Sequence, residues 1–212
     1  MKALKLLIVI LVTTLTVQAQ TTALTVTLKK GLTMLDSAKT SEQYLQAAGY
    51  FQNIADAEKK QWLPYYYTAY SNLMAAINSK GANDLKDNLY DKAMLYTNKA
   101  DIIVPQNSEV YVLKGYITFM KMSVEPQARA MQMIPEADTY LIKATSLDAE
   151  NPRVYMVRGQ SAYFTPEMFG GGKDVAKPLL ATGVEKYNKQ AAKDAAPSWG
   201  KARCATLLKQ CN

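Results

Sequence analysis

The chain has 212 residues, of which 49% are hydrophobic and 20% are charged. These values exclude a mainly disordered chain, and the length suits one domain or a short repeat array. The formal net charge is +7, but the lysines are scattered along helical stretches, as on a solvated surface, which excludes nucleic-acid binding. Histidine is absent, so His-based triads, His-ligated zinc and the usual proton shuttle are excluded.

The first 19 residues have the pattern of a secretory signal peptide. Lys2 and Lys5 precede an apolar run over residues 6–12, and small residues follow, with cleavage expected after Ala19. The apolar run is too short to cross a bilayer comfortably. The sequence therefore predicts an exported protein that does not span the membrane after cleavage. A retained N-terminal anchor is the alternative.

Helical periodicity dominates the rest of the chain. Residues 40–43 (Thr-Ser-Glu-Gln) are typical of a helix start, with a hydroxyl cap followed by an acidic and an amide residue. Apolar residues then recur at helical spacing. Further helices are expected over residues 62–77, 89–103, 109–122, 137–147, 154–163, 175–193 and 197–210. The sequence therefore predicts an all-α fold.

An internal repeat underlies these helices. Three alanines lie 46 and 44 residues apart, and three small residues follow them at the same two intervals. An aromatic residue stands four positions before each member of the second set. The first set is Ala47, Ala93 and Ala137, the second is Ala69, Gly115 and Gly159, and the aromatics are Tyr65, Tyr111 and Tyr155. Small residues at such spacing let helix axes approach closely.

This pattern resembles the tetratricopeptide repeat (TPR) over about residues 24–190. The resemblance implies a TPR-like α-α superhelix of about four helical hairpins with a C-terminal capping helix. It implies a single domain over residues 20–212, with units 24–61, 62–107, 108–151 and 152–193 and a cap over 197–210. The units exceed the usual length of roughly 34 residues, and the excess falls between the two helices of each unit, near residues 79–89, 123–135 and 170–172.

The chain is also similar to secreted helical-repeat proteins of Bacteroidota-type bacteria. The similarity rests on three blocks: Trp-Leu-Pro-Tyr-Tyr at residues 62–66, a glycine loop at residues 170–172, and Pro-x-Trp-Gly at residues 197–200. It implies a location in the Gram-negative envelope, periplasmic or secreted.

The TPR resemblance implies a non-enzymatic protein that binds a peptide or protein partner in a concave groove. Aromatic residues with a polar tip suit such recognition, although packing between helices is an alternative role for them. An enzyme would need an acid/base pair, and no carboxylate pair stands out. The expected groove residues are Tyr66, Tyr70, Leu73, Val112, Tyr116, Phe119, Met156, Gln160 and Tyr163.

A second hypothesis assigns a role to the methionines of residues 120–133. Met120, Met122, Met131 and Met133 bracket a polar insertion, and thioethers in an exported protein suit a small-ligand or Cu(I) carrier. Packing is the competing explanation, because methionine fills irregular gaps. We otherwise expect no metal site and no cofactor. The glycines at 170–172 lack the order of a phosphate-binding loop.

Cys204 and Cys211 are the only cysteines. Export permits a disulfide between them, but seven residues of helix separate Cα atoms by roughly 10 Å, which is too far for a bond. A disulfide therefore requires the helix to end near Leu208 and the tail to fold back. The sequence is compatible with a Cys204–Cys211 disulfide and with two free thiols. It predicts no particular oligomeric state.

Overall fold

The computed structural model describes residues 23–191 and 194–212, so the predicted signal peptide lies outside the described residues. Within these two ranges the chain forms α-helices and one 3-10 turn, without any strand. The prediction of an all-α fold is confirmed. No helix of this part of the chain is long and apolar enough to cross a membrane.

A helix over residues 23–37 begins the described chain. The elements that follow are α2 (Ser41–Ala57), α3 (Trp62–Ile77), α4 (Asn83–Ile103), α5 (Ser108–Met122), α6 (Pro126–Leu147), α7 (Pro152–Phe164), η1 (Glu167–Phe169), α8 (Lys173–Lys189) and α9 (Lys201–Gln210). The predicted start of α2 is present as a capping box, in which Thr40 and Gln43 bond each other's backbone amides.

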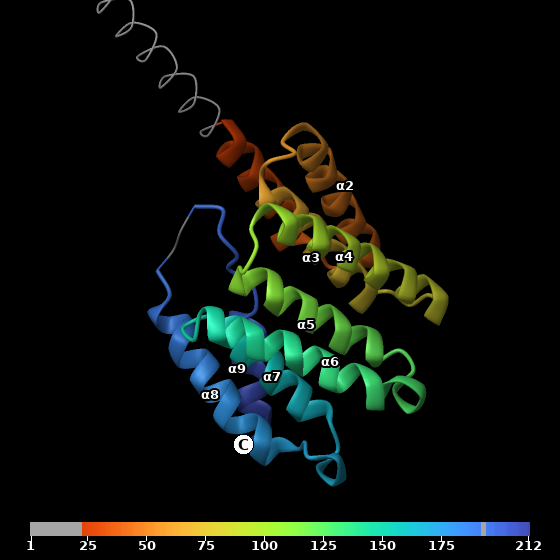
Figure 1. The fold of residues 1–212 in the computed structure, drawn as a ribbon, viewed down its shortest axis with the longest axis vertical. Helices are drawn as coiled ribbons and strands as arrows, with labels where there is room; N and C mark the ends of the chain where they lie inside the picture. The colour runs from red at the N-terminus through yellow and green to blue at the C-terminus, as the bar shows by residue number, and fades with distance from the viewer. Residues whose placement is uncertain (1–22, 192–193) are drawn as a thin grey trace, which may run out of the picture.

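The helices stack in pairs along the chain (Figure 1). The pairs α3 with α4, α5 with α6, and α7 with α8 pack extensively, and α2 packs on α3. Helix α9 packs on α7 and α8 at the C-terminal end. Because each pair joins neighbours in sequence, most of the core forms between consecutive helices, as in repeat proteins.

Small residues sit where paired helices come closest. A Cβ atom at Gly115 of α5 would lie 2.8 Å from Leu141 Cγ, and one at Gly159 of α7 would lie 2.6 Å from Leu180 Cγ. The helix over residues 23–37 approaches α2 just as closely, because a Cβ atom at Gly31 would lie 2.6 Å from the Phe51 ring. All six small residues of the predicted repeat are buried, namely Ala47, Ala69, Ala93, Gly115, Ala137 and Gly159. The unit boundaries themselves stay a prediction.

Two segments expected as inter-helix insertions are helical. Helix α4 begins at Asn83 and α6 at Pro126, so the insertions mainly lengthen the second helix of each pair. Arg129 fixes the added turns, since its guanidinium bonds both carboxylate oxygens of Asp87 on α4 at 2.6 and 2.7 Å. Pro135 lies within α6, where its missing amide proton costs one helical hydrogen bond.

The last helix begins later than predicted. Residues 194–200, which we call the strap, are not helical, and α9 starts only at Lys201. Gly200 holds a φ of 99°, a left-handed conformation that favours glycine and that a continuous helix from Pro197 would not allow. Helix α8 likewise ends at Lys189 and not at residue 193.

The close helix approach predicts opposite effects for two Gly→Ala substitutions. Gly159→Ala should lower the free energy of unfolding by about 1–3 kcal/mol, because the added Cβ overlaps Leu180. Gly49→Ala on α2 should raise it by about 0.5–1 kcal/mol, because no atom lies within 4 Å of its Cβ position and alanine favours helix. Urea denaturation measures both. If both substitutions stabilised the protein equally, α7 and α8 would not cross tightly at Gly159.

Candidate functional site

The inner face of the stack carries a row of residues at equivalent repeat positions. Tyr70 on α3, Tyr116 on α5 and Gln160 on α7 are separated by 46 and 44 residues. The side-chain amide of Gln160 donates to the Tyr116 hydroxyl at 3.3 Å. All three side chains are buried. The repeat therefore brings distant polar and aromatic groups into one continuous row.

The strap lies against this row. The Trp199 indole stacks on the rings of Tyr70 and Tyr116, with centroid distances of 4.7 and 5.8 Å. Its Nε1–H donates to the Tyr66 hydroxyl at 2.9 Å. The Tyr67 hydroxyl donates to the Ala195 carbonyl at 2.8 Å. The inner face thus binds a non-helical segment of its own chain.

The tyrosines of the inner face are neutral hydrogen-bonding groups. Burial raises the pKa of Tyr66, Tyr70 and Tyr116, although hydrogen bonds from Trp199 and Gln160 oppose the shift at Tyr66 and Tyr116. Removing a phenol from water disfavours its charged form. The hydroxyls therefore stay protonated at physiological pH, able both to donate and to accept hydrogen bonds.

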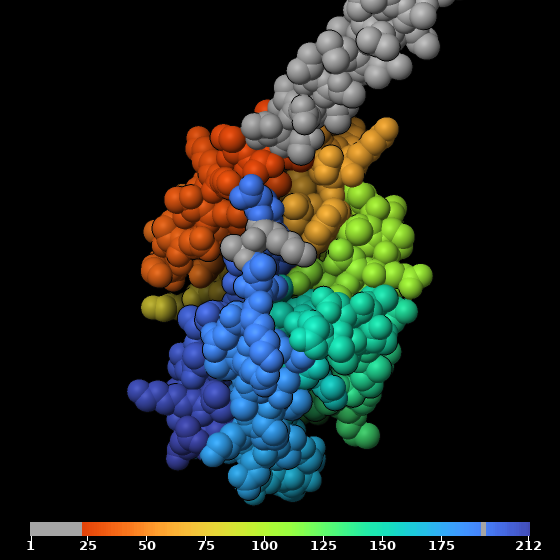
Figure 2. Space-filling model, turned by 90° about the vertical axis from the view of Figure 1, so that its left-hand side faces the viewer, coloured from red at the N-terminus to blue at the C-terminus, as the bar shows by residue number. Residues whose placement is uncertain are grey.

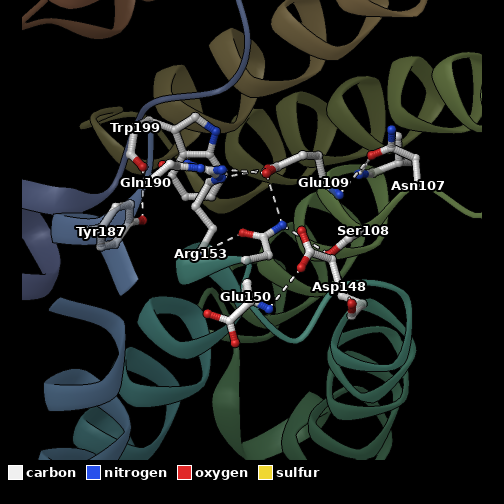
Figure 3. Close-up of polar contacts among 12 residues, drawn as sticks. Asn107, Ser108, Glu109, Asp148, Glu150, Arg153, Tyr187, Gln190 and Trp199 are labelled. Carbon is white, nitrogen blue, oxygen red and sulfur yellow. Dashed lines mark hydrogen bonds and ion pairs between the residues drawn. The ribbon is translucent and has the colours of Figure 1, made fainter. Parts of the chain in front are cut away.

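A buried ion pair lies beside the strap (Figure 3). Arg153 Nε and Nη2 donate to the two carboxylate oxygens of Glu109 at 2.7 and 2.5 Å. Arg153 is only 1% exposed, and its guanidinium also lies 5.9 Å from the Trp199 ring centroid. Burial alone would lower the pKa of Arg153, but the hydrogen bonds and charge of Glu109 outweigh it and raise that pKa.

Helix starts place this ion pair. Glu109 is in the first turn of α5 and Arg153 in the first turn of α7, and each helix begins after an asparagine cap. The α7 cap, Asn151, also donates from its side-chain amide to Glu109 and to Ser108, both at 3.0 Å. The cap and the ion pair therefore form one network that joins α5 to α7.

A cleft of about 1150 Å³ opens next to the network. Its walls come from the helix over residues 23–37, the starts of α3, α5, α7 and α9, the ends of α6 and α8, and the strap. Leu32, Trp62 and Tyr187 supply apolar and aromatic surface. Lining cations are Lys29, Arg153, Lys186, Lys189 and Lys201, and lining acids are Glu109, Asp148, Glu150 and Asp194.

Four of the five cations that line the cleft take part in ion pairs, and Lys201 is the fifth. Lys29 bridges Asp194 at 2.9 Å with both side chains more than half exposed, and Lys186 bridges Glu150 at 2.6 Å. The exposed Lys29 pair contributes little and exchanges readily, whereas the Lys186 side chain is only 15% exposed. Lys201 has no ion-pair partner among the described residues. An anionic group entering the cleft therefore meets one exchangeable ammonium group, at Lys29, and one unpaired ammonium group, at Lys201.

The predicted groove residues are mostly buried, including Leu73, and Phe119 packs apart from the row, against Ala137 of α6. Tyr66, Tyr70, Val112, Tyr116, Phe119, Met156 and Gln160 are all buried, and Tyr163 is half-buried. The strap and α9 cover part of the row, since Arg203 Nε donates to Gln160 at 2.8 Å. The role of these residues in binding a partner stays a prediction.

Packing accounts for three of the four methionines of residues 120–133. Met122 is buried with Phe119 and Ala137, and Met120 and Met133 pack against that cluster. Met131 is 96% exposed. Among the described residues, no three His, Cys, Asp or Glu side chains lie together in a metal-binding arrangement.

Both cysteines are free thiols in this structure. Helix α9 continues to Gln210, so it does not end near Leu208 as a disulfide would require. Burial raises the pKa of Cys204 to about 11, and its thiol donates to the Leu180 carbonyl at 3.4 Å. Cys204 is therefore a protonated packing residue at neutral pH.

Sequence reasoning missed the Glu109–Arg153 pair and the position of the strap. A signal was present for the pair, because residues 109 and 153 are separated by the same 44 residues as the repeat. The Pro-x-Trp-Gly block at residues 197–200 was also visible, but nothing local in it indicates that its indole stacks on α3 and α5.

The described part of the chain is an all-helical fold with a cleft beside the strap. No protein-family model matches the sequence, and no curated protein matches it. Among solved structures, the fold is similar to the HusA haemophore from Porphyromonas gingivalis, with a TM-score of 0.78 and 31% sequence identity. The match covers 87% of this chain and 90% of that chain. The chain therefore belongs to the same family as the HusA haemophore.

Glu109→Gln should lower the free energy of unfolding by about 3–5 kcal/mol, because it leaves the buried Arg153 charge without a counter-ion. The matched control is Glu185→Gln, which breaks an ion pair to Lys189 whose side chains are 64% and 69% exposed. The control should leave stability nearly unchanged, because an exposed ion pair contributes little. Chemical denaturation gives both values. If Glu109→Gln lowered the free energy of unfolding as little as the control does, the Glu109–Arg153 pair would not join α5 to α7.

Proposed function

We propose that this chain binds a porphyrin such as haem in the cleft beside the strap, and that it carries the molecule without chemical turnover. The observation that carries the proposal is the likeness to a haemophore over nearly the whole length of both chains. Fold likeness alone does not define a ligand, so the chemistry of the cleft is the second support.

The cleft suits a large planar anion. Its volume of about 1150 Å³ exceeds the roughly 300–1,000 Å³ typical of small-molecule pockets. Trp62, Leu32 and Tyr187 offer apolar contact for a ring, while Lys186, Lys189 and Lys201 offer ammonium groups for ring carboxylates. This division of apolar walls and few charged groups is the usual plan of a ligand site.

The cleft holds the ring and not the metal. Its described lining contains no His, Met or Cys, and the hydroxyl of its tyrosine, Tyr187, already donates to the Trp199 carbonyl at 3.0 Å. Histidine, methionine, cysteine and tyrosine are the side chains that ligate haem iron in proteins. An iron-free porphyrin should therefore bind about as tightly as haem.

Export and the TPR-type architecture belong to the same proposal. The predicted signal peptide directs the chain across the inner membrane, where a carrier of this kind meets its ligand. We infer a TPR-like stack from the repeated close crossings at Gly31, Gly115 and Gly159.

A peptide partner is the second candidate function. It is favoured because the inner face binds the non-helical strap through Ala195 and Trp199. Cu(I) carriage has no comparable support.

Absorbance titration of the mature protein with hemin and with protoporphyrin IX tests the proposal. Both should bind, and Trp62→Ala should weaken both by about tenfold, equivalent to ~1.4 kcal/mol of lost ring contact. Phe169→Ala, which removes a 71% exposed aromatic residue in the turn before α8, should have no effect.

Two charge-reversal substitutions in α9 serve as a test and its control for the role of the cleft cations. Lys201→Glu in the cleft should weaken porphyrin binding, whereas Lys209→Glu on the same helix, outside the cleft lining, should not. Both variants change the net charge equally, so a general electrostatic effect would weaken both alike. Failure of the wild-type protein to bind either porphyrin would overturn the proposed function.

A further inference from the structure

The strap separates two hollows that would otherwise join. Besides the large cleft, a cavity of about 180 Å³ is lined by Tyr44, Tyr70 and Trp199. Leu32 and Ser198 line both spaces. Figure 2 shows the C-terminal part of the chain crossing this face between the N-terminal helices and the α6 side. Lifting the strap would therefore connect the cleft to the aromatic row of the inner face.

The strap is held by contacts that another molecule can reproduce. Its planar ring, that of Trp199, stacks on Tyr70 and Tyr116. Its carbonyl oxygens accept hydrogen bonds from tyrosine hydroxyls, at Ala195 from Tyr67 and at Trp199 from Tyr187. A planar aromatic molecule with carboxylate oxygens offers the same two kinds of group.

The conformation of the strap favours its release. Ala195 has a φ of 54°, a left-handed conformation that is unfavourable for a residue with a Cβ atom. The charged tie of the strap, Asp194 with Lys29, lies at the surface with side chains 76% and 55% exposed and contributes little. The stacked indole and the tyrosine hydrogen bonds therefore provide most of its attachment.

We propose that the strap is an internal competitor for the porphyrin site. Trp199 occupies the stacking position on Tyr70 and Tyr116 in the free protein, and an entering porphyrin displaces the indole and takes that position. This inference rests on the proposed function and adds its regulation, since the free energy of detaching the strap is subtracted from the affinity of the ligand.

Trp199→Ala tests the competition, because the proposal predicts that this substitution raises the affinity for porphyrin. Protoporphyrin IX should bind the variant about tenfold more tightly than it binds the wild type, because no indole has to be displaced. Trp199→Phe, which keeps an aromatic ring but loses the indole N–H, should lie between the two. Circular dichroism establishes that each variant is folded, and Phe169→Ala serves as the aromatic control.

Hydrogen exchange of the wild-type protein gives a second test that needs no variant. Adding protoporphyrin IX should speed amide exchange in residues 194–200 while slowing it at the start of α3. Slower exchange in the strap, or binding to Trp199→Ala that is equal or weaker, would overturn the competition and leave the proposed function standing. If neither the wild type nor Trp199→Ala binds porphyrin, the proposed function and this inference fail together.

Discussion

The structure depends on one steric constraint, the close approach of paired helices at residues without a large side chain. Gly31 meets Phe51, Gly115 meets Leu141, and Gly159 meets Leu180, each at a distance that leaves no room for a Cβ atom. Because each large residue comes from the next helix in the chain, every crossing sets the position of one pair. Repeating the crossing aligns the first helices of the pairs, which places Tyr70, Tyr116 and Gln160 in one row.

The row would be an exposed aromatic surface without the C-terminal part of the chain. The strap places Trp199 on Tyr70 and Tyr116, and the Arg153 guanidinium near the same indole is neutralised by Glu109. The buried ion pair joins α5 to α7 beside the strap. The carrier role that we propose benefits from a face held in this way, because little ordering of the face is then needed when the ligand binds.

The sequence predicted the helices and their repeat, and it named Tyr70, Tyr116 and Gln160 as groove residues, but it did not predict the cleft or the strap. Local signals were sufficient for the capped start of α2 at Thr40 and for the small residues at Gly115 and Gly159. They failed at residues 83–88 and 126–136, two helical segments that are joined by the contact between Arg129 and Asp87. They also failed at the strap, because its conformation depends on tyrosines more than 120 positions earlier in the chain. The repeat interval between Glu109 and Arg153 was visible, but spacing alone does not show which equivalent positions touch.

The central claim is that the ligand, the cleft and the inner aromatic face form one site. The two tryptophans lie at its two parts, Trp62 in the cleft and Trp199 on the strap. The most direct measurement is therefore the pair of indole N–H signals in a nitrogen-15 correlation NMR spectrum as protoporphyrin IX is added. Our account predicts that both signals move, with that of Trp199 losing the shift caused by its hydrogen bond to Tyr66 and by its stacked rings. Binding that leaves both indole signals unchanged would contradict it.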